Sequence, residues 1–113
     1  MRVWDLPPNI LCREHLLGEH RELHAIYSVI LNNKIGYSHH SETIRWVGKL
    51  PALKIRHEQI VKEMQKRGYK HYSPLIDAPG EFVQNKFVNT IEEQKQILKN
   101  KHCECKINLK KAD

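Results

Sequence analysis

The sequence predicts an all-α fold, a compact single domain of three main helices joined by long loops. Three segments carry apolar residues at intervals of three or four, the spacing that places side chains on one face of an α-helix. The chain has 113 residues, of which 40% are hydrophobic and 28% charged, which suffices for one modest core. No repeat, low-complexity tract or linker divides it. Residues 1–113 therefore form one domain, with an N-terminal arm at 1–12 and a basic tail at about 102–113.

The arm is predicted to be extended chain that ends in a turn. Its first six residues have no helix cap, and they run directly into Pro7 and Pro8.

The first helix is predicted over about 13–32, because apolar residues and one histidine recur there at helical spacing. They are Leu16, His20, Leu23, Ile26, Tyr27, Ile30 and Leu31. A loop is predicted over 33–49, and it contains Gly36, the adjacent His39 and His40, and Trp46.

The second helix is predicted to start near Pro51, a residue favoured in a first helical turn, and to end at Lys66 and Arg67 before Gly68. Its predicted buried residues are Leu53, Ile60, Val61 and Met64. The third helix is predicted from Thr90, which forms a capping box with Glu93, to about Lys101.

Composition restricts the functional class. No apolar run is long enough for a membrane span, so no membrane partner is predicted. Three cysteines without framework spacing suit a reducing compartment, and we expect a cytoplasmic protein, associated with the nucleoid if it is prokaryotic. The net charge of +6 favours a polyanionic partner, although many basic proteins bind none.

Along one edge of the first helix's apolar face runs a stripe that contains Glu22. Its members are His15, Gly18, Glu22, Ala25 and Val29. A carboxylate at the border of a buried face could act as an acid or base. The stripe alone is also consistent with a surface glutamate that pairs with a nearby cation. Of the two interpretations, this structural one is the more common in proteins.

Several segments in order resemble one enzyme family. Residues 15–23, which include Arg21 and Glu22, resemble the helix that carries the catalytic Arg-Glu pair of the pyrimidine-dimer DNA glycosylase/AP-lyase family, the phage-type dimer glycosylases. Residues 49–69 and 77–82 are also similar to that family. The opening residues 1–4 and the segment 36–46 resemble its cellular branch. The resemblance covers roughly the first hundred residues.

The resemblance implies a fold in which the N-terminal segment is threaded between three helices, and an enzyme that uses its own N-terminal amine. That amine attacks C1′ of the damaged nucleotide, expels the base and forms a Schiff base, after which β-elimination nicks the strand. By position the amine belongs to Met1. An α-amine has a pKa of about 7.7–8.0, so about a tenth of it is the neutral nucleophile at pH 7.

The other site residues are also implied by position. Glu22 matches the essential glutamate, which stabilises the cationic sugar and moves protons to the ring oxygen and from C2′. Arg2 and Arg21 match phosphate-binding arginines, His15 matches a histidine of the site, and Lys99 matches a further basic residue. The expected partner is double-stranded damaged DNA, and the protein is expected to be a monomer.

The sequence departs from the family in two places. A family arginine falls on Ala25, so His24 is expected to replace its phosphate contact or the contact is missing. The aromatic tail of the phage-type members is absent, so base stacking must come from other residues, and the candidates are Tyr37, Trp46 and Tyr72.

Neither a cofactor nor a metal is predicted. The segment 102–105 (His-Cys-Glu-Cys) matches no standard zinc spacing. His57, on the buried side of the second helix, is interpreted as a hydrogen-bonded core histidine. The alternative function is a non-catalytic nucleic-acid-binding module on the same fold, and trapping of an imine with borohydride would distinguish the two.

Overall fold

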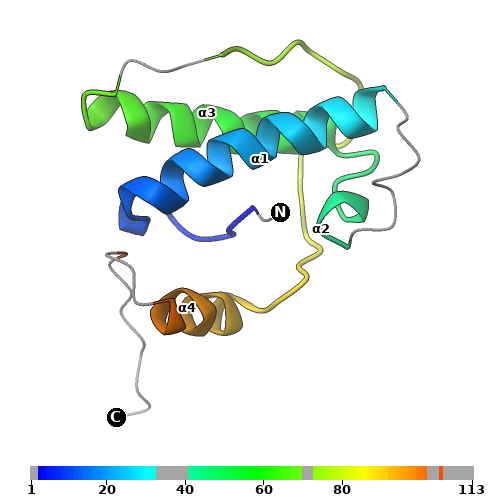
Figure 1. Ribbon diagram of the computed structural model, residues 1–113. Coiled ribbons are helices and arrows are strands. Elements are labelled where there is room, and N and C mark those ends of the chain that lie inside the picture. The colour runs from blue at the N-terminus through cyan, green and yellow to red at the C-terminus, as the bar shows by residue number, and fades with distance from the viewer. Residues whose placement is uncertain (1–2, 33–40, 70–72, 102–104, 106–113) are drawn as a thin grey trace.

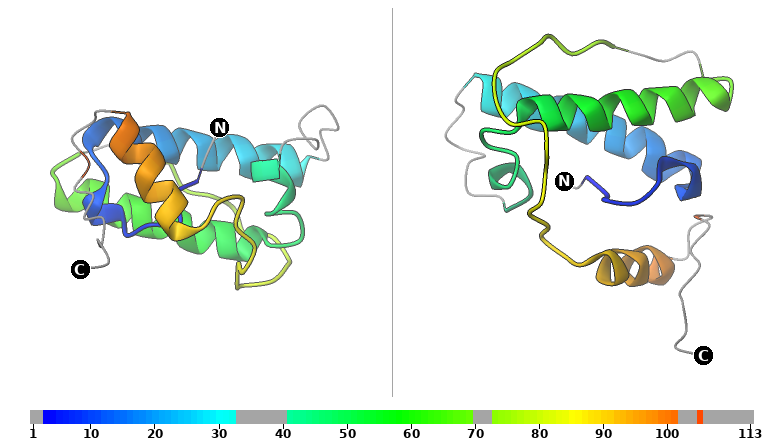
Figure 2. Two further views of the ribbon diagram at one scale, coloured as in Figure 1. Left: turned by 90° about the horizontal axis from the view of Figure 1, so that it is seen from below. Right: turned by 180° about the vertical axis from the view of Figure 1, so that it is seen from behind.

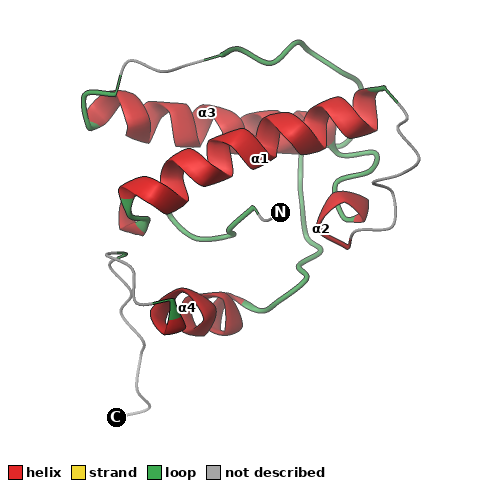
Figure 3. Ribbon diagram, viewed as in Figure 1, coloured by secondary structure: helices red, strands yellow, loops and turns green. Residues whose placement is uncertain are grey.

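The computed structural model describes residues 3–32, 41–69, 73–101 and 105, and these residues contain helices and loops but no strand (Figure 3). Its elements are η1 (Pro8–Ile10), α1 (Arg13–Leu31), α2 (Ser41–Ile44), α3 (Leu50–Lys66) and α4 (Ile91–Asn100). The all-α prediction is confirmed, and the three long helices agree with the predicted ranges to within about a residue.

Helices α1 and α3 lie side by side and form the main layer of the fold (Figure 1). Each presents an apolar stripe to the other, as the three-to-four spacing predicts. Buried residues of the two stripes include Leu16, Leu23, Ile26, Tyr27, Leu53, Ile60 and Met64. The predicted stripe of α1 ends earlier than expected, since Ile30 is half-buried and Leu31 is exposed.

The N-terminal arm lies between this layer and α4 (Figures 1 and 2). Its Val3, Trp4 and Leu6 are buried and belong to the same core as Leu98 of α4. The threaded N-terminal segment is therefore confirmed for residues 3–12. Because the core closes around the arm, the arm cannot be displaced without exposing these apolar side chains to water.

Local sequence determines where α3 and α4 end and begin. The Thr90 side chain accepts a hydrogen bond from the Glu93 N–H, and the Glu93 carboxylate accepts one from the Thr90 N–H, which completes the predicted capping box. After α3, Gly68 adopts a φ of 83°, a left-handed conformation that favours glycine.

One part of the predicted loop over 33–49 is helical, so that prediction was wrong at α2. This helix is a single turn, too short to show a periodic pattern in sequence. Its Glu42 is buried, together with Arg45 and Trp46 directly after it. Residues 33–40, including Gly36, His39 and His40, lie outside the described residues.

The long loop between α3 and α4 is attached to the start of α3 at Gly80. The Glu81 N–H donates to the Gly48 carbonyl (2.9 Å), and the Glu81 carbonyl accepts from the Ala52 N–H (3.2 Å), which no α3 carbonyl can satisfy. A Cβ on Gly80 would lie 2.7 Å from the Gly48 carbonyl oxygen. Only glycine allows this close approach.

None of the described helices has the length and apolar character needed to cross a membrane.

Candidate active site at the N-terminal arm

The first described residue of the arm is held at both of its backbone groups. The Val3 N–H donates to Glu42 Oε1 (3.2 Å), and the Val3 carbonyl accepts from Arg45 Nη2 (2.9 Å). The same Glu42 oxygen accepts from Arg45 Nε and Nη2 at 2.9 and 2.6 Å. All three residues are buried, where charge-assisted hydrogen bonds are strong. The Glu42–Arg45 pair therefore fixes the position of the chain two residues after its start.

Glu19, from the middle of α1, holds the next residue of the arm. Its Oε1 accepts from the Trp4 N–H (3.1 Å), and Arg56 of α3 donates to both of its oxygens at 2.6 and 3.1 Å. Arg56 also donates to the Leu6 carbonyl (2.8 Å). Burial raises the pKa of the Glu19 carboxyl, and the Arg56 guanidinium offsets part of that rise. The pair connects α1, α3 and the arm.

Helix α4 holds the arm from the other side. The Asp5 N–H donates to Gln94 Oε1 (2.7 Å), Gln94 Nε2 donates to the Asp5 carboxylate (3.0 Å), and Arg45 Nη1 donates to its other oxygen (3.0 Å). Gln94 is fully buried. Five side chains from α1, α2 and its following turn, α3 and α4 thus bind consecutive backbone groups of the arm.

Glu22 lies one helical turn after Glu19, on the same side of α1. It is half-buried, and within the described ranges its carboxylate has no hydrogen-bond or ion-pair partner. Glu19, by contrast, is 2% exposed and fully engaged. Among the described residues, Glu19 is therefore occupied by structural contacts, whereas Glu22 makes none of these contacts.

The remaining predicted site residues are distributed around the arm. Arg21 is exposed, and its guanidinium passes near Gly18, where a Cβ would lie 3.8 Å from Nη2. Lys99 is exposed in the last turn of α4. Met1 and Arg2 lie outside the described residues.

His15 lies in the first turn of α1, half-buried, with its ring 6.0 Å from the Trp4 ring in an edge-to-face arrangement. Burial, followed by the nearby Lys101 ammonium, lowers the pKa of its imidazole. The ring is therefore biased towards its neutral form.

Sequence reasoning missed the polar residues that hold the arm: Glu19, Glu42, Arg45, Arg56 and Gln94. One indication was present. Glu19 is three residues after Leu16 and four before Leu23, so it falls within the apolar stripe of α1. A carboxylate in a buried stripe requires a buried cation, but the sequence does not say that Arg56 supplies it.

His57 is buried and hydrogen-bonded, as predicted. It forms a cluster with His20 and His24, in which the Nε2 atoms of His24 and His57 are 3.1 Å apart, and its Nδ1 lies 3.2 Å from Glu58. Because His24 takes part in this cluster, the expected use of His24 as a phosphate contact has no support from its surroundings.

Trp46 was one of the residues predicted to stack on a DNA base, and this prediction is wrong. It is 3% exposed, and its Nε1 is directed at the buried Glu42 (3.4 Å), so its ring cannot reach a base. Tyr37 and Tyr72 lie outside the described residues.

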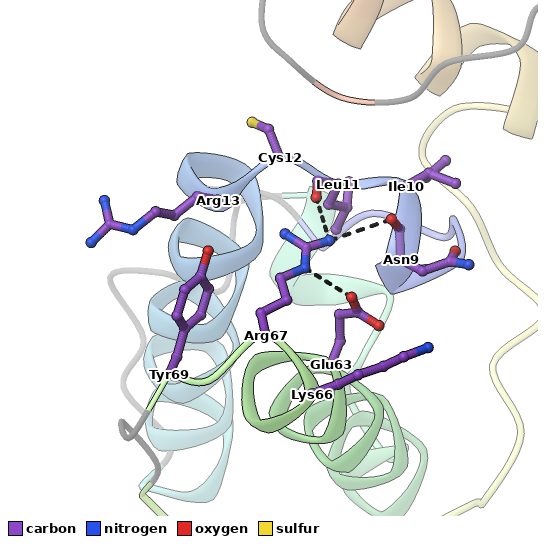
Figure 4. Close-up of a pocket in the computed structure, with 9 residues that line it drawn as sticks. All are labelled: Asn9, Ile10, Leu11, Cys12, Arg13, Glu63, Lys66, Arg67 and Tyr69. Atoms are coloured by element: carbon purple, nitrogen blue, oxygen red, sulfur yellow. Dashed lines mark hydrogen bonds and ion pairs between the residues drawn. The ribbon is translucent and has the colours of Figure 1, made fainter.

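A hollow of about 640 Å³ lies between the start of α1 and the end of α3, and it contains none of the predicted site residues (Figure 4). Arg67 crosses it to donate to the Leu11 carbonyl (2.6 Å) while pairing with Glu63 (2.8 Å). The Arg67 guanidinium in this hollow therefore holds η1 against α3. The hollow is a structural contact region between helices, and we do not place the active site there.

Comparison with known proteins gives one match. A family model described as pyrimidine dimer DNA glycosylase matches residues 1–77, which include the arm, α1, α2 and α3. No curated protein and no solved structure matches the chain.

Proposed function

The chain belongs to the pyrimidine dimer DNA glycosylase family, and on that premise we propose that it excises dimerised pyrimidines through a Schiff base formed by its own N-terminal amine. The proposed nucleophile is the α-amine of Met1, and the proposed acid–base residue is Glu22. The same intermediate would give the enzyme AP-lyase activity on double-stranded damaged DNA, with a monomer as the acting species.

The observation that carries this proposal is the anchoring of the arm. Met1 precedes Val3 by two residues, a span of at most about 7 Å. Val3 and Trp4 are fixed by Glu42 and Glu19. Glu22 lies on α1 one turn beyond Glu19, the residue that binds Trp4, and the arm lies beside α1 in Figure 1. This anchoring of Val3 and Trp4 supports the proposal that the α-amine acts together with the Glu22 carboxylate.

The chemistry then follows from these two groups. The neutral amine forms a bond to C1′ as the C1′–N bond to the base breaks, and the base leaves with the electron pair and takes up a proton. The Glu22 carboxylate takes a proton from the attached amine and delivers it to O4′ as the C1′–O4′ bond opens, which leaves a protonated imine. Glu22 then accepts the proton from C2′, and the 3′ phosphate leaves by β-elimination.

Contacts to the DNA backbone are proposed for Arg2, Arg21, Lys99 and His15. Arg21 and Lys99 are exposed on α1 and α4, on either side of the arm. Cations in these positions can hold phosphates without reading sequence.

Borohydride trapping tests the proposal, because reduction converts an imine between enzyme and DNA into a stable covalent bond. Matched duplexes would carry a thymine dimer, an abasic site or no lesion. We expect covalent complexes with the first two only, and peptide mapping should place the bond on the N-terminal residue. A protein that binds all three duplexes without trapping would be the non-catalytic binding module instead.

A further inference from the structure

Two sulfur atoms and one imidazole nitrogen converge at the start of α1. Cys12 is the N-cap residue of this helix, His15 lies in its first turn, and Cys105 comes from the segment after α4. His15 Nδ1 lies 3.1 Å from Cys12 Sγ and 3.3 Å from Cys105 Sγ. The three atoms lie within 4.8 Å of one another. We call these three residues the Cys–His cluster.

Hydrogen bonds alone do not account for this arrangement. One imidazole nitrogen offers either a single proton or a single lone pair, so it cannot bond fully to two sulfurs at once. Cys12 makes no side-chain cap hydrogen bond to its own helix. Figure 4 shows its side chain directed away from the hollow. A cation could instead be bound by all three atoms together.

The donor set and the spacing fit Zn²⁺. Bonds of about 2.3 Å to sulfur and about 2.0–2.1 Å to nitrogen, in a tetrahedron, separate ligand atoms by roughly 3.5–3.8 Å. The two nitrogen–sulfur separations, 3.1 and 3.3 Å, are a few tenths of an ångström shorter than these values, and the sulfur–sulfur separation is no more than 4.8 Å, so small side-chain shifts would admit the ion. Thiolate and imidazole ligands select zinc over the hard cations Mg²⁺ and Ca²⁺, which prefer oxygen.

The surroundings favour the charge that two thiolates would bring. The Cys12 N–H donates to Cys105 Sγ (3.0 Å), the kind of outer-shell hydrogen bond that supports a ligand sulfur. The amino end of α1 carries partial positive charge, and Lys101 adds a full positive charge near His15.

We propose that Cys12, His15 and Cys105 bind one structural Zn²⁺ ion that fastens the segment after α4 to the start of α1. The fourth tetrahedral position is left for water or another donor. Because the metal would use Nδ1, His15 keeps Nε2 for a DNA phosphate. The His15–Trp4 ring contact then joins the metal site to the arm.

The test is metal analysis of the full chain purified under reducing conditions. We expect about one Zn²⁺ ion per chain. Exchange for Co²⁺ should give intense visible bands of a tetrahedral ion and a near-ultraviolet thiolate-to-cobalt charge-transfer band. Cys12→Ser and Cys105→Ser should each weaken zinc binding by at least about 100-fold, since loss of outer-shell partners alone costs about 10–100-fold.

The matched control is His24→Gln, in the separate cluster with His20 and His57, which should bind zinc as the unchanged protein does. Three results would overturn the proposal: no zinc with a Cys12–Cys105 disulfide instead, a cobalt protein without the thiolate band, or zinc lost from His24→Gln but kept in Cys12→Ser. The cobalt spectrum needs no variant, so misfolded variants cannot obscure the outcome. Metal content is measured without DNA, so it can fail independently of the proposed glycosylase activity.

Discussion

Two glutamates one turn apart on α1 occupy different environments. Glu19 is buried and accepts three hydrogen bonds, from Arg56 and from the arm. Glu22 is half-buried without a described partner. A carboxylate paired on every side holds structure together, whereas one left unengaged beside a reactive centre can stabilise positive charge and transfer protons. The proposal therefore separates a structural glutamate from a catalytic one.

Substitution of each glutamate by glutamine tests this separation. Glu22→Gln should lower glycosylase turnover by about 100- to 10,000-fold, because proton transfer is lost, while the melting temperature stays close to that of the unchanged protein. Glu19→Gln should destabilise the fold by up to about 3–5 kcal/mol, because it leaves the partly buried Arg56 without its counter-charge. Single-turnover kinetics and thermal melts give both readouts. Turnover of Glu22→Gln within tenfold of the unchanged enzyme would refute the catalytic assignment.

Moving or blocking the N-terminal amine tests its proposed role as the nucleophile. One glycine added before Met1 keeps a free amine of similar pKa but moves it by about 3.5 Å. Displacement of that size should slow imine formation by about a hundredfold. Acetylation of Met1 should abolish trapping, because it removes the lone pair.

Intact mass must first establish that Met1 is retained and unblocked. Circular dichroism and thermal melts should be unchanged, since neither modification touches Val3 or the core. Full trapping by the acetylated protein would exclude Met1 and direct attention to lysines near Glu22.

Among the elements, the loop between α3 and α4 depends on one close backbone contact. Gly80 brings Glu81 against Gly48 and Ala52, which satisfies an N–H at the start of α3. This attachment sets the path of the chain towards α4. It therefore affects where Gln94 meets the arm.

Gly80→Ala should lower the free energy of unfolding more than the matched variant Gly68→Ala. At Gly68 an added Cβ meets open space, so the cost is the left-handed conformation alone, about 1–2 kcal/mol. At Gly80 the φ is 145° and the Cβ would also meet the Gly48 carbonyl, which forces the loop away from α3. Denaturant titrations of both variants measure the difference, and an equal loss at the two positions would show that the close approach is unimportant.

For the whole molecule, the net charge of +6 and the exposed cations beside the arm indicate that binding to undamaged DNA is largely electrostatic. Such binding releases counterions from the duplex and weakens as salt is added. Such attraction acts on the duplex as a whole and does not by itself distinguish damaged from undamaged sites.

Affinity for undamaged duplex should fall by about 40-fold between about 50 and 200 mM salt if Arg2, Arg21 and Lys99 each hold one phosphate. Arg21→Gln should reduce the slope of log affinity against log salt by about 0.9. Lys62→Gln is the control, since Lys62 is exposed on α3, which carries none of the proposed contacts. A slope that is unchanged in Arg21→Gln would remove Arg21 from the DNA contacts.

The sequence by itself determined the three long helices of this protein. Apolar spacing identified α1 and α3, the Thr90–Glu93 pair marked the start of α4, and Gly68 marked the end of α3, because all of these depend on residues within a few positions of one another. The family resemblance, carried by segments within roughly the first hundred residues, was sufficient to indicate the DNA glycosylase family, and the family match over residues 1–77 confirms that family.

Only the tertiary structure decided how these elements hold the arm. Arg56 meets Glu19 across 37 positions, Gln94 meets Asp5 across 89, and Cys105 meets Cys12 across 93. For the same reason, no short sequence motif could reveal the Cys–His cluster. Local propensity reports which face of a helix is buried, but the partner of a buried charge or thiol depends on which distant segment packs there. That choice is made when the core closes around the arm and water is excluded from its polar groups.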